Sequence, residues 1–158
     1  MADKTIPLWS LDSIFPSIES SEHQIAKENL KNGLQDLQKM VETKPNNKDF
    51  FPWLDSYLQL YNKTISLFAS IYAYAHAVYS CDTTNTAFLN NLSQIEEVLV
   101  IVEDIQFLFT KILTENAQAL PEFYTTYPQY AQYQFLFEEI IESDKHLMTR
   151  EEENIANN

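Results

Sequence analysis

The sequence has little of the material from which tight turns and disulfides are made. Its 158 residues include one glycine, six prolines and one cysteine. A β-sandwich or barrel needs frequent tight turns, and a phosphate-binding loop needs several glycines, so neither is expected. The single thiol, Cys81, has no second cysteine with which to form an internal disulfide, which agrees with a reducing compartment. We interpret Cys81 as a small residue at a helix end.

Basic residues are also scarce. Ten Lys and Arg against 23 Asp and Glu give a formal net charge of −13. Affinity for a phosphate backbone or an anionic membrane surface comes largely from Lys and Arg, so we expect no nucleic-acid and no membrane partner. The sequence has no apolar run of about 18 residues, and Met1–Pro7 holds no apolar stretch of signal-peptide length. These absences lead us to expect a cytoplasmic protein.

Apolar residues, by contrast, are plentiful and regularly spaced. They make up 45% of the chain, and aromatic residues make up 13%, which suits one domain with a buried core. Over long stretches they recur every three or four residues, the spacing of an amphipathic helix. The sequence therefore predicts an all-α fold, an antiparallel bundle of about four long helices over residues 22–43, 52–79, 86–115 and 129–143.

Local signals mark the expected helix ends. Ser21 and Gln24 have the spacing of a capping box, and Pro45 ends the first helix. Gly33 lies inside that helix, at a cost of about 1 kcal/mol relative to alanine. An aromatic segment is bracketed by two prolines, and we expect Pro128 to kink the chain or to separate this segment from the fourth helix.

Both ends of the chain differ from the bundle. Residues 1–20 lack periodicity and predict an extended arm pinned by apolar side chains, whereas 21–148 form the helical bundle. Thr149 and Glu152 again have capping-box spacing, so residues 149–158 are interpreted as the start of a short, truncated helix. We expect such a helix to belong to a longer protein.

The second and third helices each carry two apolar stripes, more than a small bundle can bury. We expect Leu58, Phe68 and Leu99 in the core, and Tyr74 and Ile101 on an apolar patch of roughly several hundred Å² that stays exposed. In an isolated chain a second copy could cover this patch. A homodimer with two-fold symmetry is therefore expected.

Residues for catalysis or metal binding are not predicted at any position. The histidines are His23, His76 and His146, and none is followed by Glu, so the HExxH zinc motif is absent. His76 is interpreted as a hydrogen-bonded histidine of the core or of an interface, with a ligand or base role as the alternative. Glu142 and His146 are interpreted as a surface contact.

Tyrosines and acidic clusters have similarly simple interpretations. The tyrosine stripe is interpreted as packing, with a ligand groove as the alternative, because the hydroxyls would lie at the rim of an apolar face. The clusters Glu138–Glu139 and Glu151–Glu153 lack the loop residues of a calcium site and are interpreted as solvated helix faces. On composition alone the chain is an acidic α-helical domain without catalytic function.

Three segments carry a more specific resemblance. Trp9–Ser17 resembles the opening of the oligoendopeptidase F group of zinc metallopeptidases, in the thimet-oligopeptidase-type family, where a Trp-x-Leu start leads to an aromatic-Pro turn. Tyr72–His76, followed by Asp82–Asn85, resembles the tyrosine-alanine helix end and acidic-threonine turn of that group. Lys145–Glu153 resembles its Lys-x-His-Leu-Ser-x-x-Glu-Glu segment, with Met148-Thr149 in place of Leu-Ser. Their order and spacing fit, so the resemblance spans essentially the whole chain.

This resemblance implies an N-terminal, non-catalytic helical region that forms a wall or lid of a channel for short peptides. Proteins of the group continue for several hundred residues, and the HExxH helix, the further Glu ligand and the substrate-gripping residues lie in that later part. The zinc and the hydrolysis of oligopeptides would thus belong to the full-length parent, and the partner of this region would be its own catalytic domain. The alternative is a free-standing acidic helical module that binds a partner helix.

Overall fold

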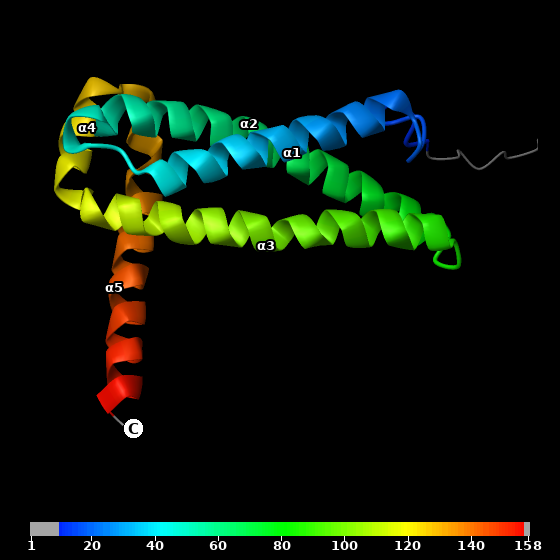
Figure 1. The fold of residues 1–158 in the computed structure, drawn as a ribbon. Helices are drawn as coiled ribbons and strands as arrows, with labels where there is room; N and C mark the ends of the chain where they lie inside the picture. The colour runs from blue at the N-terminus through cyan, green and yellow to red at the C-terminus, as the bar shows by residue number, and fades with distance from the viewer. Residues whose placement is uncertain (1–9, 157–158) are drawn as a thin grey trace, which may run out of the picture.

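The predicted all-α helical bundle is confirmed. The computed structural model describes residues 10–156, with side chains for residues 10–146 apart from Asn47, and the described residues contain no strand. Three long helices, α1, α2 and α3, run lengthwise beside one another, and each packs against the other two (Figure 1). The short α4 follows at one end of this group, and α5 then runs crosswise and away from it. The bounds are α1 Ser21–Thr43, α2 Phe50–Cys81, α3 Thr86–Glu115, α4 Leu120–Thr126 and α5 Gln134–Ala156.

The chain between α3 and α5 departs from the expected fourth helix. The two-proline segment forms α4, and Pro128–Tyr133 is a 3₁₀ turn, so α5 starts at Gln134 and not at residue 129. The helix expected to begin at Thr149 is part of α5, which continues without a break to Ala156. The reason is that no glycine or proline lies between residues 134 and 156 to end the helix, and capping-box spacing alone does not interrupt one.

Aromatic stacking and one ion pair set the direction of α5. The ring of Phe123 in α4 stacks on those of Tyr127 and Tyr130, with centroids 5.1 and 5.6 Å apart. The hydroxyl of Tyr130 donates to Oδ1 of Asp55 at 2.7 Å, which ties the turn to α2. Further along, Nζ of Lys111 in α3 lies 2.7 Å from Oδ1 of the buried Asp144 in α5. These contacts hold α5 across the end of the three long helices.

The N-terminal arm is partly buried, but its described residues are not extended as predicted: they form turns, in which the amides of Ile14 and Phe15 donate to the carbonyl oxygen of Leu11. Trp9 and the residues before it lie outside the described residues. Phe15 of the arm is buried edge-on against Tyr74, with ring centroids 5.1 Å apart. Tyr74 was expected on an exposed patch, but the arm covers it and leaves it 3% exposed. The cap of α1 also lies one residue before the expected one, because Oγ of Ser20 accepts from the amide of His23.

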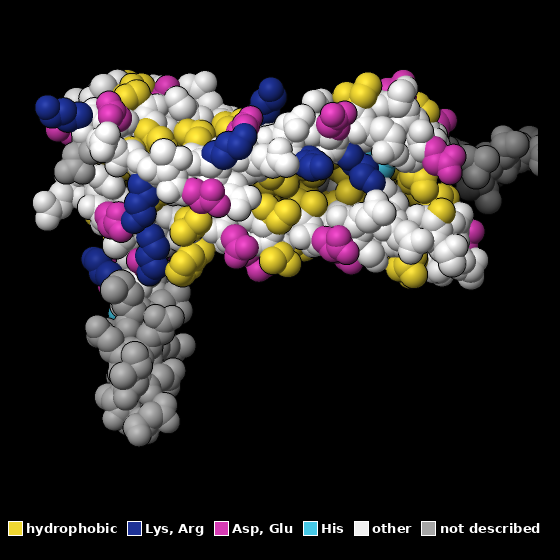
Figure 2. Space-filling model, in the orientation of Figure 1, with side chains coloured by type: hydrophobic (Ala, Val, Ile, Leu, Met, Phe, Trp, Pro, Cys, Tyr) yellow, Lys and Arg dark blue, Asp and Glu magenta, His cyan; other side chains and the backbone are white. Residues whose placement is uncertain are grey.

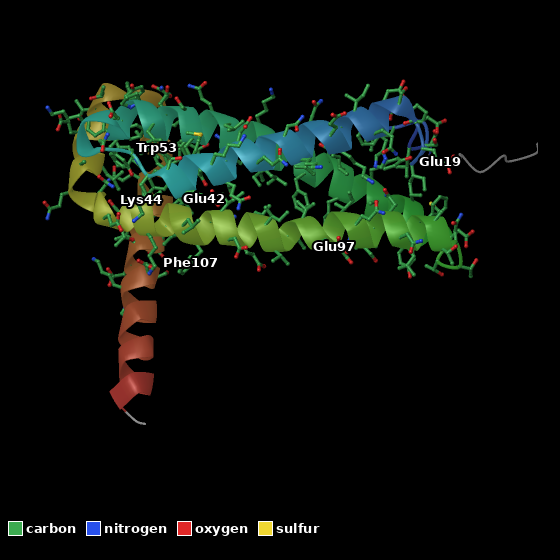
Figure 3. The ribbon with its side chains drawn as sticks, in the orientation of Figure 1. Glu19, Glu42, Lys44, Trp53, Glu97 and Phe107 are labelled. Carbon is green, nitrogen blue, oxygen red and sulfur yellow. The ribbon has the colours of Figure 1, made fainter. Side chains whose placement is uncertain are left out.

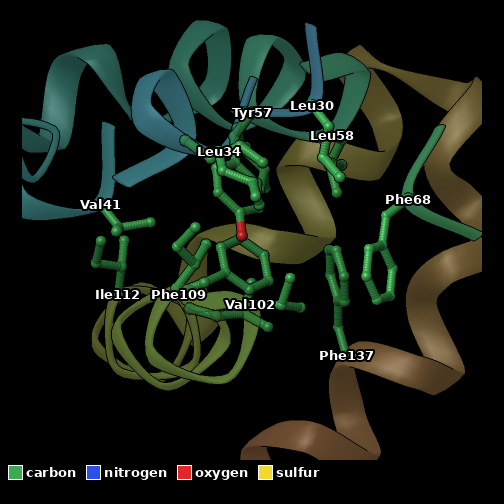
Figure 4. Packing of buried hydrophobic residues seen from close by; sticks show 14 of the residues in the cluster. Leu30, Leu34, Val41, Tyr57, Leu58, Phe68, Val102, Phe109, Ile112 and Phe137 are labelled. Carbon is green, nitrogen blue, oxygen red and sulfur yellow. The ribbon is translucent and has the colours of Figure 1, made fainter. Parts of the chain in front are cut away.

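The core lies where the three long helices meet and continues toward α4 and the first turns of α5 (Figure 4). Leu58 and Phe68 are buried in it, as the periodicity predicted. Leu99 was predicted there too but is 37% exposed. On α3 the core positions are taken by neighbours at helical spacing, and Leu99 lies at the margin of their face. Those neighbours are Leu92, Ile95, Val102, Ile105 and Phe109.

Candidate functional site

The histidine singled out from the sequence is not in the core. His76 is exposed, and its ring meets that of Tyr72 edge-on at 4.5 Å. The buried positions in this part of α2 are Ile71, Tyr74 and Ala75, so His76 falls on the outer side of the helix. The core interpretation of His76 was therefore wrong.

A different histidine, His23, is completely buried. Its Nδ1 lies 2.9 Å from the carbonyl oxygen of Ile18, which can only accept, so Nδ1 carries the proton. Among the described residues its Nε2 has no hydrogen-bond partner, and its ring packs against those of Phe15 and Tyr74. Burial lowers the pKa of His23. Sequence periodicity could not reveal the burial of His23, because the arm that buries its ring has no helical pattern.

The other chemically distinctive residues lie on the surface. Nε2 of His146 is 3.4 Å from Oε1 of Glu142 and both side chains are exposed, which confirms the predicted surface contact. Cys81 is exposed at the last position of α2, as predicted, and Glu138 and Glu139 are exposed on α5. Nowhere in residues 10–146 do three or more His, Cys, Asp or Glu side chains gather in a way that could hold a metal ion.

No helix in the described part of the chain is both long enough and apolar enough to cross a membrane.

A broad groove lies between α1 and α3, with a volume of about 800 Å³. Hydrophobic side chains show along this seam between the two helices (Figure 2). Buried leucines of α1 form one side of its floor, and α3 supplies the other side, where Ile101 is 41% exposed. The apolar floor consists of Leu30, Leu34, Ile95, Val98 and Ile101.

Two lysines lie on the α1 rim of this groove, one helical turn apart. Nζ of Lys27 bonds to the neutral amide oxygen of Gln94 at 2.9 Å, across the groove. Within residues 10–146 neither Lys27 nor Lys31 pairs with a carboxylate, although acidic residues outnumber basic ones more than two to one in the chain. The groove therefore offers an apolar floor with Lys27 and Lys31 on one edge, where the carboxylate of Glu28 also lines it.

The side of α3 opposite the groove carries isolated exposed apolar residues. Val100 and Phe107 are each 61% exposed, and Phe107 lies on the side of α3 that faces away from α1 (Figure 3). Nζ of Lys111 lies 5.4 Å from the centre of the Phe107 ring. The side chains of Val100 and Phe107 protrude from the surface. Isolated exposed apolar residues are common on protein surfaces, so the groove is the stronger candidate site.

Comparison of the chain with protein-family models, with curated proteins and with solved structures gives no match. The geometry and chemistry of the groove are thus the basis for assigning a role.

Proposed function

We propose that this chain is a binding domain whose α1–α3 groove holds a segment from the surface of another polypeptide. The observation that carries this proposal is the groove itself, an apolar floor beside the lysines Lys27 and Lys31, which lack carboxylate partners among residues 10–146. Grooves of this kind take an amphipathic helix, whose apolar residues at i, i+3, i+4 and i+7 enter the floor.

The charges of the two lysines indicate which side chains the bound segment should carry. Lys27 and Lys31 lie four residues apart on α1, so they follow one edge of the groove with the spacing of a single helical turn. A bound helix with Asp or Glu on the edge that meets them would complete two ion pairs, while its apolar face covers Ile101. Each pair would be partly desolvated at the contact and would favour one orientation of the segment over the other.

The resemblance of three segments to the oligoendopeptidase F group supports a specific identity for the occupant. In such a peptidase the groove would meet the catalytic portion of the zinc enzyme, and this chain would form a wall or lid of the channel for short peptides. The described residues do not offer a ligand set for zinc, so the ion would be held by the catalytic portion. This chain would contribute docking and access, and the peptide bond would be cleaved elsewhere.

The test is to tag the gene at the start of this reading frame in its natural setting and to purify the product. The proposal expects a protein several hundred residues longer than this chain, with one zinc per molecule and chelator-sensitive cleavage of a quenched fluorescent oligopeptide. The isolated 158-residue chain should show neither the zinc nor the cleavage. A product of 158 residues that copurifies with no peptidase would overturn the peptidase assignment and favour the free-standing interaction module.

A further inference from the structure

A second, smaller cavity lies where α2, α3 and α5 meet, and it does not share any residue with the α1–α3 groove. Its volume is about 310 Å³. An apolar cavity of roughly 150 Å³ is large enough for benzene, so this one suits a molecule of about two rings. Leu136 of α5 lines the cavity and is 50% exposed, so the cavity opens to solvent on the side of α5. The apolar part of the lining consists of Tyr57, Leu58, Phe109, Leu136, Phe137 and Ile140.

Tyr57 contributes the face of its ring to this lining, and its hydroxyl takes no part. The ring stacks in parallel on that of Phe109 with centroids 4.3 Å apart, and Phe109 in turn meets Phe137 edge-on at 6.0 Å. The hydroxyl oxygen of Tyr57 is fully buried, out of reach of a molecule in the cavity. The floor is therefore aromatic and apolar, and any polar recognition has to come from other residues.

Two further tyrosines, Tyr61 of α2 and Tyr133 of the turn before α5, bring their hydroxyls to the same cavity. The hydroxyl of Tyr61 accepts from Nε2 of Gln106 at 2.7 Å, and the hydroxyl of Tyr133 accepts from Nδ2 of Asn62 at 3.0 Å. An amide nitrogen can only donate, so each bond uses a lone pair of the hydroxyl oxygen and leaves the phenol proton available. Neither hydroxyl donates a hydrogen bond to any described residue. The cavity thus holds two free donors, each fixed in place by a side-chain amide.

The electrostatics of the cavity favour a neutral ligand with an acceptor oxygen. A hydroxyl that accepts one hydrogen bond becomes a better donor for the next, because hydrogen bonds in a chain polarise one another. None of the described residues that line the cavity is charged, so a charged ligand would lose its hydration here without an opposite charge in return. The formal net charge of −13 further disfavours an anion.

We propose that this cavity binds a neutral molecule of about two rings with a carbonyl oxygen, which accepts from the hydroxyls of Tyr61 and Tyr133. A carbonyl oxygen has two lone pairs and takes both bonds. The aromatic floor contacts the rings of the ligand, and the two hydroxyls set its orientation. The inference is independent of the proposed role of the groove, because the two sites are formed by different residues.

A matched pair of small molecules tests the proposal. The probes are 1-indanone, a bicyclic ketone, and indane, which has the same rings without the carbonyl oxygen. Each is titrated into the full chain labelled at methyl groups, and binding is followed by NMR. The methyl signals of Leu58 and Ile140 in the cavity should shift, whereas that of Leu30 in the groove should stay in place. The ketone should bind more tightly than indane, by about 2- to 13-fold for each net hydrogen bond.

Phenylalanine variants assign this preference to the two hydroxyls. Tyr61→Phe and Tyr133→Phe each remove one donor and should each lower the preference, and the double variant should bind both probes with equal affinity. Tyr57→Phe is the matched control, because it removes a hydroxyl that the ligand does not reach, and it should keep the full preference. Indane makes no hydrogen bond, so an unchanged affinity for indane shows that the cavity of a variant is intact.

A second readout uses the unmodified chain alone. The ¹³C signal of a ketone carbonyl moves downfield when its oxygen accepts a hydrogen bond, so carbonyl-labelled 1-indanone should resonate downfield of its position in cyclohexane when bound. A bound signal at the cyclohexane position would overturn the proposal, whatever the variants do. The proposal is equally overturned if neither probe shifts the cavity methyls selectively at its solubility limit, if the unmodified chain has no ketone preference, or if the double variant retains that preference.

Discussion

A Cβ atom on Gly33 would lie 2.5 Å from Oγ1 of Thr64, much closer than two such atoms can approach. Thr64 is buried, so it cannot turn into solvent to make room. The only glycine of the chain therefore lies at a point where α1 and α2 are too close together for a side chain to fit. Its weak helix propensity is the cost of this close approach.

Gly33→Ala should consequently destabilise the protein, although alanine is the better helix former. We expect a loss of about 1 to 3 kcal/mol in the free energy of unfolding, as for other overpacked sites. Chemical denaturation followed by circular dichroism measures it. In a Thr64→Ala background the two nearest atoms, Oγ1 and Cγ2, are gone and only Cβ remains, at 3.3 Å, so the same substitution should cost much less. A loss of equal size in both backgrounds would show that Thr64 is not the obstacle.

Leu58 and Leu99, both predicted from helical periodicity to lie in the core, should differ sharply in their contribution to stability. Leu58→Ala removes a side chain that is 4% exposed and should cost about 2 to 5 kcal/mol, through lost burial and the cavity that remains. Leu99→Ala removes one that is 37% exposed and should cost less than about 1 kcal/mol. Urea denaturation of the two variants in parallel gives the comparison, and equal losses would contradict the placement of Leu99 at the margin of the core.

His23 should make stability depend on pH. Its pKa in the folded protein is lowered, chiefly by burial and further by the charge of Lys27, against the opposing hydrogen bond to Ile18. In the unfolded chain the pKa is about 6.5. As the pH falls below about 6.5, the unfolded chain binds a proton that the folded chain does not, so the free energy of unfolding decreases until the folded pKa is passed.

The measurement is the free energy of unfolding between about pH 7.5 and pH 5, above the range in which most carboxylates titrate. His23→Gln has no titrating ring, so its stability should change less over this interval than that of the unmodified chain. His76→Gln serves as the control, because His76 is exposed, and it should keep the full dependence. Identical slopes for all three proteins would exclude His23 as the source.

Charges introduced at Tyr74 and at Ile101 should have opposite consequences. Tyr74→Asp places a charge under the N-terminal arm and should unfold the protein or destabilise it severely. Ile101→Asp leaves the fold intact, because the side chain is half-exposed in the groove.

The isolated chain should associate into dimers with rising concentration, and Ile101→Asp should weaken this association. Sedimentation velocity over a concentration series decides it, and a strict monomer throughout would show that the groove has no affinity for a second copy.

Sequence patterns predicted the parts of this fold that depend on helical periodicity alone. The third helix lies over residues 86–115 as expected, because long apolar repeats and the Asn85 cap leave little freedom. The burial of His23 and Tyr74 depends instead on an arm without periodicity, and the course of α5 depends on tertiary contacts such as Lys111 with Asp144. The groove could not be predicted either, since its width is set by how α1 and α3 pack on α2.

Cysteine labelling of the native protein tests most directly the claim that the α1–α3 groove is covered by another polypeptide surface. In a Cys81→Ser background, Ile101→Cys places a thiol in the groove, and Val100→Cys places one on the adjacent, outward side of α3. Both thiols should react readily with a maleimide in the isolated chain. In the protein purified from its natural setting, the thiol at position 101 should react much more slowly than in the isolated chain, while the one at position 100 reacts at an unchanged rate. Equal reactivity of position 101 in the two preparations would contradict the account.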